Sequence, residues 1–306
     1  MTAERADWLA APERGSRLLL RLMARLSLYV GRAASRVPLH AITAYFYLFS
    51  PHARRAARRY QRRALGREPT CPERYRQFAY FATTIHDRVF LANGRDHLFE
   101  ISVDGEELMR AQAATGRGAI LLGAHLGSFD VVGAIGRRLG GVRICMAMYE
   151  ENARKIRDAM ASIAPGGGPD VVALGRVDAM LQISERLDAG AFVGILGDRT
   201  FGDEPLQAVT LLGERAGLPT GPMRIAAILG CPVIFMAGLY RGANRYHVVF
   251  EKVADFGAAR RAERGAQVTV AVERYARLLD LRCRSDPQNW FNFYEFWPPS
   301  GARRHG

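Results

Sequence analysis

The sequence predicts an α/β protein with a largely parallel central sheet flanked by helices and preceded by a basic amphipathic helical segment. Short apolar runs alternate with amphipathic stretches from residue 119 onward, which is typical of strands and helices that alternate along the chain. Arginine concentrates near the N-terminus, where residues 1–70 carry a net charge of +10 out of +13. A chain of 306 residues, 49% hydrophobic and 24% charged, is not disordered. We expect two parts, residues 1–70 and residues 71–306.

Residues 14–36, if helical, place a cationic stripe on an apolar body. At 100° per residue, six arginines fall within an arc of about 100°, and mainly leucine covers the other faces. Such a helix suits a lipid interface, with acyl chains below it and anionic phosphates alongside. Pro38 is expected to end the helix. The arginines of the stripe are Arg14, Arg17, Arg21, Arg25, Arg32 and Arg36.

An apolar run and a second arginine cluster follow. Residues 39–49 (LHAITAYFYLF) would form a helix of about 16 Å, too short to cross a hydrocarbon core of about 30 Å. Six arginines lie between residues 54 and 63, and phosphates are their natural partners. These helices could instead pack on the protein's own core, or residues 54–63 could bind a nucleic-acid backbone. The aromatic residues beside the cluster favour an anionic membrane surface and no nucleic acid, so we expect a membrane-associating, monotopic segment over residues 1–70.

The rest of the chain reads as one domain. Residues 73–93 have the apolar spacing of one long helix. Strands are expected at residues 119–124, 142–148, 171–174, 191–197, 233–239 and 246–250, and helices at residues 128–139, 152–163, 177–187 and 222–229. Ligands in such folds bind at the carboxyl ends of the strands, where the polar groups around His125 and Asp198 are expected.

The segment GAHLGSFD (residues 123–130) holds the strongest chemical signal. With His125 in the strand-to-helix turn and Asp130 in the first helical turn, the two side chains can meet. A carboxylate that holds the imidazole in one tautomer leaves the other nitrogen free as a general base for a hydroxyl. Ser128 is expected to cap the following helix and not to act as a nucleophile. The alternative is a chance spacing without a catalytic role.

Three further sequence segments follow this one along the chain, and we call the four together the sequence blocks. They are residues 190–200 (GAFVGILGDRT), 212–222 (LGERAGLPTGP) and 286–297 (DPQNWFNFYEFW). Together the four blocks resemble the bacterial lipid A biosynthesis acyltransferases of the lauroyl and myristoyl type. That family falls within the wider lysophospholipid acyltransferase group, whose signature is His, four residues, then Asp or Glu. The basic N-terminal segment lies where family members have a membrane anchor.

The resemblance implies an acyltransferase catalytic domain over residues 71–306. An acyl group would pass from an acyl carrier protein or coenzyme A thioester to a hydroxyl of a membrane lipid, without a metal or a resident cofactor, at the cytoplasmic face of the bacterial inner membrane. His125 would be the base and Asp130 its orienting partner. Arg199 suits a phosphate, although a salt bridge to Asp198 or Asp203 is the alternative. The implied substrate-binding residues are Asp198, Arg199, Gly213, Thr220 and Gly221.

Two departures from the family pattern bear on the acceptor lipid. Many lipid A enzymes have Asn and Glu where this chain has Ala124 and Asp130, and Glu295 stands where their ending is usually basic. An acid near an anionic acceptor disfavours the lipid A precursor, so we expect another lipid, such as one of an aryl-polyene pathway. A thioesterase or other hydrolase at the same site and a non-catalytic membrane-binding protein are the alternative functions. A Rossmann or P-loop site is not expected, because neither glycine motif occurs.

The cysteines and the N-terminus bear on the compartment. The four cysteines are 52 or more positions apart and suggest neither a CxxC metal pair nor a disulfide framework. Residues 1–11 (MTAERADWLAA) do not resemble a signal peptide. We therefore expect a reducing compartment, with the protein in the cytoplasm or facing it.

Overall fold

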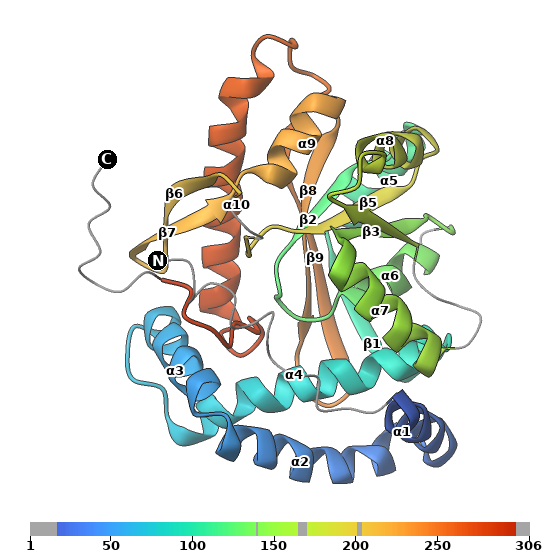
Figure 1. The fold of residues 1–306 in the computed structure, drawn as a ribbon, viewed down its shortest axis with the longest axis vertical. Helices are drawn as coiled ribbons and strands as arrows, with labels where there is room; N and C mark the ends of the chain where they lie inside the picture. Colours follow the sequence, from blue (N-terminus) through green and yellow to red (C-terminus); the bar gives the residue numbers. More distant parts are fainter. Residues whose placement is uncertain (1–16, 139, 165–169, 201–203, 298–306) are drawn as a thin grey trace.

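The computed structural model describes residues 17–138, 140–164, 170–200 and 204–297, and it has three layers (Figure 1). A seven-stranded sheet forms the middle layer, and helices cover both of its faces. The strands are β1 (Glu100–Asp104), β2 (Ile120–Gly123), β3 (Ile144–Tyr149), β4 (Val171–Leu174), β5 (Phe192–Leu196), β8 (Pro232–Tyr240) and β9 (Arg245–Asp255), in the spatial order β1-β9-β8-β2-β5-β3-β4. All neighbours pair in parallel except β8 and β9, which confirms the predicted largely parallel sheet.

The helices divide between the two faces because residues along the central strands alternate in direction. In β2, Ile120 and Leu122 belong to one hydrophobic core and Leu121 belongs to the other. The first core includes α8 (Ala179–Asp188), α9 (Gly221–Leu229) and α10 (Arg264–Ser285). The second includes α4 (Cys71–Ala92), α5 (Glu106–Ala114), α6 (Phe129–Arg138) and α7 (Glu150–Ile163).

Several elements were not predicted from the sequence. They are β1, α5, α10 and a separate antiparallel hairpin of β6 (Leu206–Leu211) and β7 (Glu214–Pro219), which packs against α10. Helix α10 buries Tyr275, Leu279 and Cys283 at helical spacing, yet arginines interrupt its apolar pattern. Strand β1 alternates between exposed and half-buried residues at the sheet edge, so no apolar run marks it.

The N-terminal helices differ from the prediction in where they break. Helix α1 (Arg17–Val30) ends before Gly31, whose φ of 84° favours glycine, and α2 (Arg32–Phe49) then runs through Pro38 without ending. The prediction that Pro38 ends a helix over residues 14–36 is therefore wrong. Helix α3 (Pro51–Leu65) carries the six predicted arginines. No helix in the described ranges is both long enough and apolar enough to cross a bilayer.

The break at Gly31 also divides the predicted arginine stripe. Arg21 and Arg25 are exposed on α1, whereas Arg32 and Arg36 point inward from α2. Arg32 forms a two-pronged ion pair with the fully buried carboxylate of Asp87, with Nε–Oδ1 and Nη2–Oδ2 distances of 2.7 and 2.8 Å. Arg36 donates to the hydroxyl of Tyr240. The inner part of the stripe thus binds α2 to the protein, and Arg14 lies outside the described residues.

The turn from β2 to α6 packs backbone against backbone. Gly127 has a φ of 76°, and the Ser128 N–H donates to the carbonyl of Gly238 on β8. A Cβ added at Gly127 would lie 2.0 Å from that carbonyl oxygen, so this position accepts glycine alone. The close approach holds the residues before α6 against the sheet.

Gly127→Ala is expected to lower the free energy of unfolding by about 3 kcal/mol or more, because a left-handed conformation and a backbone clash act together. Gly213→Ala is the matched control, since Gly213 has a φ of 83° but open space around a Cβ, and it should cost about 1 kcal/mol. Chemical denaturation measures both. Equal losses would contradict the close approach at Gly127.

Candidate active site

The candidate site lies where two central strands end. His125 follows β2 and Asp198 follows β5, and these strands are parallel neighbours with Gly123 opposite Leu196. Their carboxyl ends therefore meet at one edge of the sheet, as predicted for these two polar groups. The tertiary fold brings together residues that are 73 positions apart.

The Asp198 carboxylate holds His125 at two points. Its Oδ1 is 2.9 Å from the ring Nδ1 of His125, and its Oδ2 accepts the backbone N–H of His125 at 3.0 Å. The Asp198 side chain is almost fully buried, whereas about a third of the His125 side chain (32%) is exposed. Asp198 therefore fixes the imidazole on its Nδ1 side, and the exposed part of the side chain can contact a ligand.

Electrostatics determine which tautomer this contact selects. Burial alone would raise the pKa of the Asp198 carboxyl, but attraction and hydrogen bonding from His125, with the charge of Arg199 nearby, hold it well below its ordinary value. Burial lowers the pKa of His125 below 6.5, and Asp198 offsets this only in part. At neutral pH the ionised carboxylate can only accept, so Nδ1 carries the hydrogen and Nε2 presents a lone pair.

The C-terminal segment also contacts the site, next to the turns that follow β2 and β5. Trp290 is fully buried, and its indole Nε1 donates to Asp198 Oδ2 at 2.9 Å. The Phe291 N–H donates to the carbonyl of His125, and Gly127 donates to that of Asn289. The sequence alone predicts no role for Trp290. The available signal was its place in the aromatic block at residues 286–297, which does not show what it contacts.

Asp130 differs from the prediction. Its Oδ2 accepts the Nε–H of Arg88 on α4 at 2.8 Å, and the carboxylate in contact with the His125 ring is that of Asp198. Asp130 is the second residue of α6, a helix that packs on α4, so its side chain meets α4 while His125 faces β5. The structure therefore assigns the expected contact with His125 to Asp198, which was predicted to bind substrate.

Arg199 lies beside the same carboxylate. Its Nη2 donates to the carbonyl of Phe291 at 3.0 Å, and its guanidinium carbon is 5.1 Å from the centre of the Tyr294 ring. The charge of Arg199 lowers the pKa of both Asp198 and His125. Asp203, the other partner considered for Arg199, lies outside the described residues.

The other residues predicted from the sequence lie in the β6–β7 turn and at the starts of α9 and α6. Gly213 occupies the turn between β6 and β7, where the preceding Leu212 N–H donates to Asp280 of α10. Thr220 and Gly221 stand at the start of α9, where the Thr220 hydroxyl donates to the carbonyl of Pro205. Ser128 precedes α6, but its buried hydroxyl has no hydrogen-bond partner among the described residues, so the expected side-chain cap is not formed.

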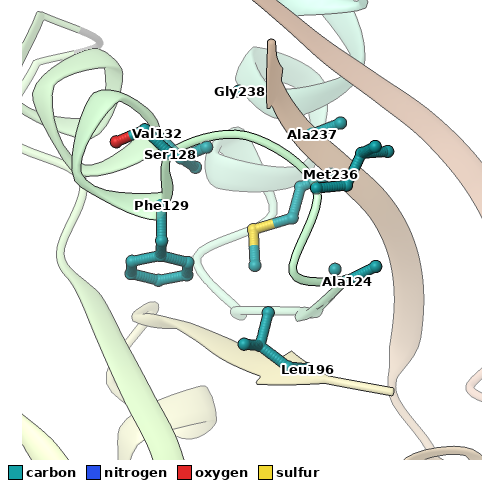
Figure 2. Close-up of a pocket in the computed structure, with 10 residues that line it drawn as sticks. Ala124, Ser128, Phe129, Val132, Leu196, Met236, Ala237 and Gly238 are labelled. Carbon is teal, nitrogen blue, oxygen red and sulfur yellow. The ribbon is translucent and has the colours of Figure 1, made fainter. Parts of the chain in front are cut away.

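A small apolar pocket adjoins the histidine. Both neighbours of His125, Ala124 and Leu126, line it. Figure 2 shows the thioether of Met236 reaching between Phe129 and Leu196, so side chains from β8, α6 and β5 close around the space. The pocket offers apolar contact to a ligand bound at the imidazole.

Residues 21–297 match the model of the family described as bacterial lipid A biosynthesis acyltransferase. The chain belongs to this family. The match covers every element from α2 to the C-terminal aromatic segment and confirms the resemblance seen in the four sequence blocks. The protein is therefore an acyltransferase of a membrane-associated family whose chemistry is acyl transfer to a lipid. No curated protein sequence matches the chain.

Exchanging each carboxylate for its amide separates Asp198 from Asp130. Asp198→Asn is expected to lower kcat by about 10²- to 10⁴-fold, the contribution of a positioned base, because the amide no longer fixes the tautomer. Asp130→Asn, the matched control, should stay within about tenfold of the parent. Steady-state acyl transfer measures both, and the reverse order would restore Asp130 as the orienting residue.

The His125–Asp198 pair also predicts how kcat/KM changes with pH. A general base must be neutral to accept a proton, so with His125 as the expected base kcat/KM of the parent should fall with acid through a pKa below 6.5. Asp198→Asn removes the charge that stabilises the imidazolium, which moves this limb to still lower pH. An unmoved limb in Asp198→Asn would contradict the contact.

Proposed function

We propose that the protein transfers a fatty acyl group from an acyl carrier protein or coenzyme A thioester to a hydroxyl of a membrane lipid, with His125 as general base. The observation that carries this proposal is the imidazole of His125, whose Nδ1 is held by Asp198 and whose side chain is about one third exposed (32%) next to a small pocket, in a chain of this family.

The proton and the acyl group follow from this geometry. Nε2 of His125 takes the proton of the acceptor hydroxyl while its oxygen attacks the thioester carbonyl carbon. The carbon–sulfur bond then breaks, and the leaving thiolate takes the proton back from the imidazolium, which yields an ester and a thiol. Asp198 stabilises the imidazolium between these two steps. The reaction needs no acyl-enzyme intermediate, so no role as nucleophile falls to Ser128.

The two substrates have plausible places at the site. The pocket beside His125 is about the size of one water molecule, and its mostly apolar lining suits contact with the carbon next to the thioester carbonyl. Arg199 suits a phosphate of the donor or the acceptor. Thr220 and Gly221 remain candidates for substrate contact, whereas Gly213 is better explained by the turn it forms.

We also propose that the acceptor is a lipid other than the lipid A precursor. Glu295, on which this expectation rests, forms an ion pair with Arg59 of α3 at 2.8 Å, and both side chains are at least half exposed. The pair offsets part of the positive charge that α3 would offer to an anionic acceptor. Mass spectrometry of lipids acylated by the purified protein tests the proposal, and efficient acylation of the lipid A precursor would contradict it.

Helix α2 supports docking at a membrane because its polarity is inverted. Its two buried residues are Ser35 and Thr43, and its inner arginines are bonded to the protein. Its outer side is apolar apart from His40, with Val37 71% and Phe49 66% exposed, and residues 37–49 contain no Lys, Arg, Asp or Glu. An exposed apolar face of this kind is unfavourable in water and favourable in a lipid interface.

Helix α1 continues this surface. Leu22, Leu26 and Tyr29 are 61%, 55% and 90% exposed, and the cationic Arg21 and Arg25 are exposed beside them. Apolar side chains with neighbouring arginines match acyl chains and anionic phosphates. In Figure 1, α1 and α2 lie along the same side of the molecule. We therefore propose that this side rests on the cytoplasmic leaflet of the bacterial inner membrane.

Replacing two exposed residues of α2 tests the docking surface. The double variant Val37→Asp and Leu48→Asp should reduce binding to vesicles that contain phosphatidylglycerol by about tenfold or more, because two apolar anchors are lost. Val270→Asp with Leu281→Asp on α10 is the matched control, since these side chains are also 61% and 51% exposed. Co-sedimentation measures the effect. Equal losses in the two variants, or a lipid-free dimer that α2 variants dissociate, would contradict membrane docking.

The variant His125→Ala tests the chemistry. It should lower acyl transfer by about 10²- to 10⁴-fold in a folded protein, because the hydroxyl proton loses its acceptor. The assay uses a labelled acyl thioester with membrane lipid extract, and product analysis separates ester from free fatty acid. Transfer within about threefold of the parent would exclude His125 as the base. Free fatty acid as the product would favour the thioesterase, and no turnover by the parent would favour the binding protein.

A further inference from the structure

The indole of Trp290 completes the set of donors around the Asp198 carboxylate. Oδ1 faces the ring Nδ1 of His125, while Oδ2 receives both the His125 backbone N–H and the indole Nε1–H, at 3.0 and 2.9 Å. A buried carboxylate needs such donors, because it has lost its water. Trp290 provides the only side-chain N–H to this carboxylate, among the described residues, that does not belong to His125.

Trp290 is itself held rigidly. Its ring is fully buried and meets the Tyr60 ring of α3 edge-on, with 4.9 Å between the ring centres. Its carbonyl accepts the Gln77 side-chain amide of α4 at 2.6 Å. Its neighbours Asn289 and Phe291 bond to the backbone of the His125 turn. The indole N–H is therefore a donor whose direction the fold determines.

We propose that Trp290 is a positioning residue of the acyl transfer: its indole N–H sets the Asp198 carboxylate and, through it, the imidazole of His125. This inference rests on the proposed function of His125 as the base. Trp290 bonds to the carboxylate of Asp198, and it is not among the residues that line the pocket beside His125.

A positioning role for Trp290 predicts the direction in which the pKa of His125 changes when the indole N–H is removed. The N–H of Trp290 stabilises the charge of Asp198 and thereby weakens its attraction for the imidazolium. Without this donor, the carboxylate should hold the imidazolium more tightly, so the pKa of His125 should rise. That direction is opposite to the one expected for Asp198→Asn. Burial lowers the pKa of His125, so a loosened site would also raise it, and the control must therefore loosen the packing without removing this donor.

The experiment compares two buried tryptophans. Trp290→Phe removes the donor. Trp297→Phe is the matched control, because Trp297 packs on Trp290 and its buried Nε1 has no hydrogen-bond partner among the described residues. The acid limb of kcat/KM should move up by about half a pH unit or more in Trp290→Phe, with kcat about tenfold lower, and should stay in place in Trp297→Phe. Circular dichroism checks the fold.

An isosteric replacement keeps the inference testable if Trp290→Phe does not fold. Incorporation of 3-benzothienylalanine at position 290 exchanges the N–H for sulfur and preserves the shape of the ring. Nitrogen-15 NMR of labelled histidine then follows the pKa of His125 without a substrate. A rise supports the role of Trp290, and an unchanged His125 titration in the folded protein overturns it. Full activity of His125→Ala would overturn the proposed base, a separate result.

Discussion

The site depends on the contact between His125 and Asp198, because this contact places a buried carboxylate against a partly exposed imidazole. A carboxylate without water is stable only when donors surround it. Here the backbone N–H and the imidazole of His125 and the indole of Trp290 supply them, from two separate parts of the chain. The parallel pairing of β2 and β5 brings His125 to Asp198, and the C-terminal segment adds Trp290. The chemistry of the histidine therefore follows from the arrangement of the sheet.

The C-terminal segment also joins the N-terminal helices to the site. Gln77 of α4 holds the carbonyl of Trp290, and Tyr60 of α3 packs on its ring. Aromatic contacts run from Tyr47 of α2 through Phe78 and Phe293 to Phe81, which meets Phe291 beside His125. The surface we assign to lipid and the imidazole thus belong to one packed unit.

Helix α2 has most of its polar side chains on the inner side and its apolar side chains on the outer side, so its charged groups are not on the surface that we assign to lipid. Arg32 and Arg36 have their partners inside the protein, where Asp87, Tyr240 and the carbonyl of Ala243 receive their donors. Apart from His40, the exposed side chains of α2 are apolar or aromatic. Helix α3 is built in the ordinary sense, with Ala57, Tyr60 and Ala64 buried and most of its arginines outside. Adjacent helices of similar length therefore present surfaces of opposite character, one suited to acyl chains and one to anions.

The sequence by itself determined the α/β class, most strands and helices of the main domain, the family and the importance of His125, because these depend on local periodicity and on short motifs. It could not place β1 or α10, whose apolar patterns are incomplete, and it put the N-terminal break at Pro38 where Gly31 makes it. Only the tertiary structure decided which carboxylate faces the imidazole. Asp130 lies five residues from His125 in sequence, but α6 directs it to Arg88, while Asp198 and Trp290 arrive from 73 and 165 residues away through strand pairing and the docked C-terminal segment. Contacts of that range depend on how the layers pack, which no local pattern records.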